Sequence, residues 1–146
     1  MTLNLEERFI DAGGYRTAYV EIGSGEPVLL LHSADPGVNG VREYRHNFEA
    51  LSKHFRVIAP DYIGFGNTGP LAKQPPSLSN AYVNHVLAFM DAMGIARAHL
   101  VGNSRGGLIS IQIAKEHSER AGRIILLGNA GGGVTKEYME KQALLY

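Results

Sequence analysis

The 146-residue sequence contains neither cysteine nor tryptophan. The lack of cysteine excludes disulfide bonds and cysteine nucleophiles, and it weakly favours the cytoplasm. The chain also has no net charge, because 14 basic residues balance 14 acidic ones. A neutral chain without charged runs has no basic footprint for nucleic acid or for an anionic membrane, so we expect neither partner.

Long apolar runs are missing as well. The longest, such as the one in PVLLLH, fall far short of the roughly 20 residues that cross a bilayer. The start, MTLNLEERFIDAGG, has acidic residues where a signal peptide has basic and then apolar ones. No His pair or His/Asp cluster has metal-ligand spacing, and no phosphate-binding glycine motif lies at a strand–helix junction. We therefore expect a cytoplasmic protein with no metal and no cofactor.

The sequence does contain a regular alternation of apolar runs and amphipathic segments. Segments 7–12 and 16–22 are typical of two strands joined by a Gly-Gly turn. Further strands are expected at 27–32, 55–60, 98–101 and 123–128, and helices at 41–53, 79–93, 104–116 and 135–146. This order predicts an α/β fold whose sheet is mostly parallel with an antiparallel start and carries helices on both faces.

The stretch HLVGNSRGGLIS, residues 99–110, suggests the chemistry. Gly102, Ser104 and Gly106 spell G-x-S-x-G between a predicted strand and a predicted helix. The glycines remove Cβ atoms that would collide at a sharp turn, and the serine then projects above the edge of the sheet where open α/β folds bind ligands. This setting is typical of a serine nucleophile. The alternative is that Ser104 only caps the helix.

Together with the serine turn, the segments PVLLLHSADPG and PDYIGFG resemble the α/β-hydrolase superfamily, and most closely its meta-cleavage product hydrolases. GGYRTAYVEIGSGEPVLLLH and RIILLGNAGGG extend the resemblance over nearly the whole chain. It implies attack by Ser104 on a small-molecule ester, or on a carbon–carbon bond next to a ketone. It also implies a partial hydrolase core over 1–134 and the beginning of a lid or C-terminal helix over 135–146.

The resemblance further implies an oxyanion hole between two loops. Ala34, in the loop after the strand 27–32, occupies the natural position of one N–H donor, and Arg105 supplies the other. Two such donors stabilise the negative charge of a tetrahedral intermediate. On its own, HSADPG favours a plain Pro-Gly turn, and only its combination with the serine turn favours an oxyanion loop.

The family's triad runs Ser, then Asp or Glu, then His, and no residue here matches the acid or the histidine. His32 is the nearest candidate base, although the resemblance implies a structural role for it. Asp61 is a weaker candidate acid, whose simplest role is to fix the loop 61–68. The candidates for supporting roles are His32, Ser33, Asn103 and Asp61, and the histidines expected at the surface are His46, His54, His85 and His117.

Two functions follow from these observations. The chain is either a serine hydrolase whose base comes from additional polypeptide, or a catalytically impaired hydrolase fold that acts as a binding or self-associating module. An apolar strand at a sheet edge invites pairing with another chain. We therefore expect a homo-oligomer, or pairing through 123–128.

Overall fold

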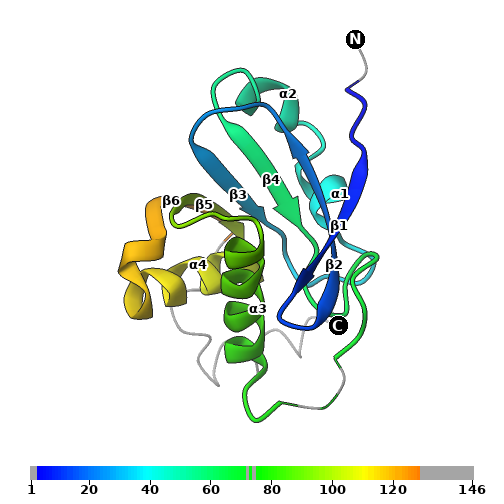
Figure 1. Cartoon of the computed structure of the whole chain (residues 1–146), viewed down its shortest axis with the longest axis vertical. Coiled ribbons are helices and arrows are strands. Elements are labelled where there is room, and N and C mark those ends of the chain that lie inside the picture. Colours follow the sequence, from blue (N-terminus) through cyan, green and yellow to red (C-terminus); the bar gives the residue numbers. More distant parts are fainter. Residues whose placement is uncertain (1–2, 72, 74, 129–146) are drawn as a thin grey trace, which may run out of the picture.

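A computed structural model describes residues 3–71, 73 and 75–128 (Figure 1). Its sheet has the strand order β1-β2-β4-β3-β5-β6. The strands are β1 (Glu7–Ala12), β2 (Tyr15–Ile22), β3 (Pro27–Leu31), β4 (Arg56–Pro60), β5 (Ala98–Asn103) and β6 (Ala121–Leu127). The helices are α1 (Gly40–Tyr44), α2 (Phe48–Leu51), α3 (Leu78–Ala92), α4 (Arg105–Glu116) and the short 3-10 turn η1 (Ser118–Arg120). Pairings β1–β2 and β2–β4 are antiparallel and the rest are parallel, which confirms the predicted α/β class.

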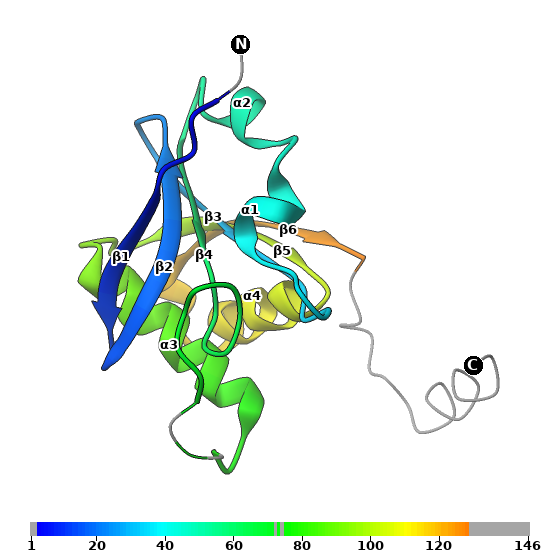
Figure 2. The same ribbon diagram turned by 90° about the vertical axis from the view of Figure 1, so that its right-hand side faces the viewer.

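Helices cover both faces of the sheet (Figure 2). On β3, Leu29 and Leu31 belong to the core that includes buried residues of α3 and α4. Val28 and Leu30 belong to the opposite core, with the side chains of α1 and α2. A strand buried on both faces needs apolar residues at every position, which explains the uninterrupted PVLLL run.

The predicted helix 41–53 is instead two short helices, α1 and α2. The Asn47 N–H bonds the Tyr44 carbonyl at 2.8 Å, a three-residue turn that interrupts the helical ladder. Asparagine favours such turns and helix N-caps over helix interiors, and Asn47 is the N-cap residue of α2. The predicted helix 135–146, and with it the proposed lid boundary, lies outside the described residues.

His85 was expected at the surface, and this expectation is wrong. Its side chain lies on the same face of α3 as Tyr82 and Phe89, and it is buried against the sheet. The Thr17 hydroxyl lies 3.0 Å from the Tyr15 carbonyl, to which it donates, and 2.7 Å from His85 Nε2. The imidazole therefore donates from Nε2, and burial lowers the pKa of His85 to about 4.

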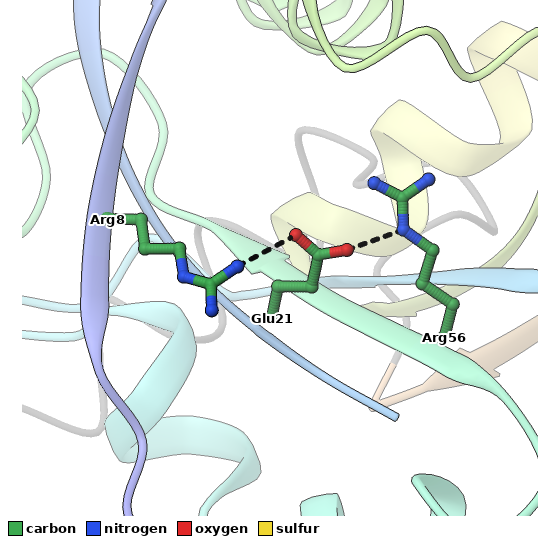
Figure 3. A network of polar contacts seen from close by, with 3 residues as sticks. All are labelled: Arg8, Glu21 and Arg56. Carbon is green, nitrogen blue, oxygen red and sulfur yellow. Dashed lines mark hydrogen bonds and ion pairs between the residues drawn. The ribbon is translucent and has the colours of Figure 1, made fainter. Parts of the chain in front are cut away.

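A charged network joins β1, β2 and β4 at the end of the sheet opposite to the serine turn (Figure 3). The Glu21 carboxylate of β2 lies 2.5 Å from Arg56 Nε and 3.5 Å from Arg8 Nη1. Ion pairs that remain partly exposed to water contribute about 0–1 kcal/mol each to the stability of the fold. This network therefore contributes more to the register of the three strands than to stability. Within the described part of the chain, no helix has the length and apolarity needed to span a membrane.

The two buried histidines make stability depend on pH. Burial lowers the pKa of His32 and of His85 to about 4, whereas an unfolded histidine titrates near 6.5. Between these values the unfolded chain binds protons that the folded chain does not. The free energy of unfolding should therefore fall as the pH drops from 6.5 to 4, by up to about 3 kcal/mol per histidine.

Urea unfolding at pH 7.5, 6, 5 and 4 checks this expectation. His85→Gln should remove its share of the pH dependence, whereas His54→Gln, at an exposed position, should leave the slope unchanged. A stability that does not change between pH 6.5 and 4 would contradict the burial argument.

Candidate active site

Ser104 occupies a strained turn between β5 and α4. Its φ of 47° makes it the sole non-glycine residue with positive φ in the described part of the chain. Such a conformation costs about 1–3 kcal/mol and persists where the surroundings enforce it, often at functional sites. Its side chain makes no capping hydrogen bond to α4, which contradicts the view that this serine merely caps the helix.

Two glycines allow the turn to form. A Cβ on Gly106 would overlap the backbone carbonyl of Leu31, and a Cβ on Gly102 would overlap the backbone of Gly106. The start of α4 therefore rests directly on the backbones of β3 and β5. The Ser104 N–H also bonds the Leu127 carbonyl at 3.1 Å, so the end of β6 helps to hold the turn.

The two expected oxyanion donors follow the ends of two neighbouring parallel strands. Leu31 of β3 is paired with Gly102 of β5, and the chain reaches Ala34 and Arg105 three residues beyond each. Arg105 is the first residue of α4, whose first N–H groups have no partner within the helix and carry positive potential. Among the described residues, neither the Ala34 amide nor the Arg105 amide donates a hydrogen bond.

The Arg105 side chain turns toward α3. Its guanidinium carbon lies 5.6 Å from the centre of the Tyr82 ring, a distance suited to a cation–π contact. The backbone amide of Arg105 therefore stays at the serine turn, while its guanidinium group packs against the Tyr82 ring.

His32 is fully engaged in holding its own loop. The Tyr62 N–H donates to His32 Nε2 at 3.2 Å, and His32 Nδ1 donates to the Ser33 carbonyl at 2.6 Å. The ring also stacks on Tyr62 with centroids 4.0 Å apart. Burial lowers its pKa to about 4, against the opposing effects of the Ser33 carbonyl and the Glu43 charge. An imidazole with both nitrogens occupied cannot accept the serine proton.

Asp61 has a structural role, because its polar contacts hold two segments of the backbone in place. Its carboxylate accepts the Gly40 N–H at 2.9 Å and thereby holds the start of α1. Its backbone carbonyl accepts the Thr68 hydroxyl at 3.0 Å, and a Cβ on Gly66 would overlap its carboxylate. Burial raises its pKa, an effect opposed by the backbone N–H groups that it accepts. These contacts fix the loop 61–68, which is the simplest role that the sequence predicted for Asp61.

Ser33 and Asn103 converge on Glu43, a residue that the sequence reasoning did not place in the site. The Ser33 N–H donates to Glu43 Oε2 at 2.8 Å, and the Asn103 side-chain amide donates to Glu43 Oε1. Glu43 lies off the apolar stripe of its segment, a pattern typical of solvent-facing residues. Its contact with Asn103, 60 residues further along the chain, leaves no trace in the local periodicity.

Within the described residues, no histidine or carboxylate hydrogen-bonds the Ser104 side chain, and no three metal-ligating side chains gather. The site as described holds a partly buried serine at a helix N-terminus, two unpaired amides and a fixed carboxylate. Of these groups, the helix N-terminus and the two amides can stabilise negative charge on a bound carbonyl oxygen.

Comparisons with known proteins agree with this geometry. Residues 26–145 match the sequence model of the alpha/beta hydrolase fold. The chain is 37% identical over 127 residues to a 2-hydroxy-6-oxo-6-(2'-aminophenyl)hexa-2,4-dienoic acid hydrolase of Metapseudomonas resinovorans, covering 86% of this chain and 43% of the relative. It is 39% identical over 127 residues to a 2-hydroxy-6-oxo-6-phenylhexa-2,4-dienoate hydrolase of Comamonas testosteroni, covering 86% and 44%.

Solved structures give the same result. The meta-cleavage product hydrolase of Pseudomonas fluorescens IP01, determined with acetates, superposes with a TM-score of 0.81 at 43% identity, over 85% of this chain and 45% of that one. The resemblance to meta-cleavage product hydrolases predicted from sequence is confirmed. The chain spans less than half the length of the curated relatives named above.

Glycine at position 106 should be essential for the turn. Gly106→Ala places a methyl group on the Leu31 carbonyl, and we expect it to lower the free energy of unfolding by about 3 kcal/mol or more, as for other backbone clashes. Thermal unfolding measures the change. Gly69→Ala is the matched control, because no atom lies within 4 Å of the added Cβ. Equal melting temperatures for the two variants would contradict the close approach.

Proposed function

Because this chain belongs to the alpha/beta hydrolase fold family, we propose that it provides the nucleophile and the oxyanion hole of a serine hydrolase. The substrate class is a small ester, or a ketone whose adjacent carbon–carbon bond is cleaved. The strained φ of Ser104 is the observation that carries the proposal. This backbone conformation is energetically unfavourable, and the serine side chain does not cap the helix, so a catalytic role accounts for the strain. We place the activity in the cytoplasm, in keeping with the lack of cysteine.

In this proposal, Ser104 Oγ attacks the substrate carbonyl carbon while a base takes its proton. The carbonyl oxygen becomes negative and accepts hydrogen bonds from the amides of Ala34 and Arg105. Collapse of the tetrahedral intermediate breaks the bond to the leaving group, which receives the proton, and water then hydrolyses the acyl-serine. The base comes from polypeptide outside the described residues, because His32 has no free nitrogen.

A fluorophosphonate probe tests the nucleophile directly. We expect one covalent adduct on Ser104 by intact mass and peptide mapping, made with the most complete assembly in which the chain is isolated. Ser104→Ala should abolish the adduct, and Ser118→Ala, at an exposed serine, should retain it. Without its base the serine is weakly activated, so labelling of the chain alone should be slow. No adduct on Ser104 in any assembly would count against the proposal.

A second function, a self-associating or binding module, is favoured by the state of β6. In the described part of the chain, β6 pairs with β5 alone and leaves its other edge open. Ile125, Leu126 and Leu127 are 55%, 41% and 42% exposed. Successive strand residues point to opposite faces, so both faces here remain apolar and accessible. An edge of this kind pairs readily with another strand.

Light scattering between 1 and about 100 µM tests this second function. We expect a concentration-dependent dimer, and Ile125→Lys should weaken its association at least about tenfold, because a charge is then buried at the edge. Ile111→Lys introduces the same change on an exposed position of α4 and serves as the control. A monomer at every concentration would exclude association through 123–128.

A further inference from the structure

The end of the β1–β2 hairpin lies against α3 and leaves a hollow beside it (Figure 2). A Cβ on Gly13, in the hairpin turn, would lie 3.2 Å from the Ala88 Cβ of α3, so the two elements approach closely. The hollow has a volume of about 350 Å³, which is within the range of small-molecule sites. Its lining is mostly apolar and includes Ala12, Ile63, Ala81 and Ala88. The hollow can therefore take up the apolar body of a small molecule.

One buried polar atom in this lining has no hydrogen-bond partner among the described residues. His85 lines the hollow and is 4% exposed. Because its Nε2 donates to the Thr17 hydroxyl, the neutral ring leaves Nδ1 without a proton, as an acceptor. Nδ1 is buried, and no donor from the described part of the chain reaches it. A buried acceptor without a hydrogen bond destabilises the fold, and a donor that reached Nδ1 would recover that free energy.

The other polar groups of the lining differ from His85 in their exposure. Lys73 and Asn84 are exposed, so their polar ends remain in water. The Tyr15 ring lies edge-on to the His85 ring, with centroids 5.7 Å apart and planes at 79°. The buried part of the hollow thus offers one unpaired acceptor within apolar and aromatic surroundings.

We propose that this hollow binds a small neutral molecule that has an apolar body and one hydrogen-bond donor, such as a phenol. The apolar body lies against the alanines and Ile63, and the hydroxyl donates to His85 Nδ1. A neutral ligand fits because an ionised group would lose its hydration against apolar walls. The proposal does not depend on the hydrolase function, because no residue of the serine turn or of the loop 32–37 lines the hollow.

Phenol and toluene test the proposal, because they have nearly the same shape and only phenol donates a hydrogen bond. Each is titrated at neutral pH into the ¹⁵N-labelled chain, and the ring nitrogens of His85 and the amides of Gly13 and Ala88 are followed by NMR. Both ligands should move the two amide signals. Phenol should shift the Nδ1 signal several times further than toluene, because only its hydroxyl hydrogen-bonds that atom.

Two variants locate the binding site. Ala88→Leu fills the hollow and should weaken the binding of both ligands at least about tenfold. Ala92→Leu, at an exposed position of the same helix and outside the lining, should change neither. His85→Phe keeps a ring in place and removes the acceptor, so it should weaken phenol binding about fivefold and leave toluene binding unchanged.

Three outcomes would overturn the proposal. An Nδ1 signal that responds equally to both ligands would show that the hydroxyl does not reach His85. Binding that Ala88→Leu leaves intact would place the ligands elsewhere, the serine site included. The third outcome is that neither ligand moves the amides of Gly13 and Ala88. The ring-nitrogen measurement uses the unmodified chain, so a loss of folding in His85→Phe leaves the test valid.

Discussion

The contact between Gly106 and the Leu31 backbone is the constraint on which the rest of the site depends. A Cβ on Gly106 would overlap the Leu31 backbone, and a Cβ on Gly102 would overlap the Gly106 backbone, so α4 starts where β3 and β5 end together. This approach accompanies the positive φ at Ser104 and brings the end of β3 beside the serine turn. A side chain at 106 would separate the two amides that the proposed mechanism requires.

Helix α1 organises the other side of the site through a series of polar contacts. Asp61, at the end of β4, holds Gly40; Tyr44 then joins the ends of β3 and β5, and Glu43 joins their loops. Burying the Asp61 carboxylate has an electrostatic cost, which its backbone donors offset. The residues that seemed candidates for acid–base chemistry, His32 and Asp61, are thus used to place a helix and a loop.

Two features of the described residues remain without a partner. None of the described histidines or carboxylates hydrogen-bonds the Ser104 side chain, and β6 exposes apolar side chains along the edge that no described strand pairs with. The Leu127 carbonyl also accepts the Ser104 N–H, so the end of β6 lies beside the serine turn.

The sequence alone determined the order of the strands, the mostly parallel sheet and the position of the serine turn. These features depend on the local periodicity of apolar residues and on a short motif in which glycines are required for a sharp turn. Sequence reasoning failed where partners lie far apart in the chain. It placed His85 at the surface, although Thr17 and the sheet bury it, and it did not place Glu43 in the site, although Ser33 and Asn103 hold it there. Only the tertiary structure decided these cases, because burial and hydrogen bonding across 60 or more residues depend on how strands and helices meet.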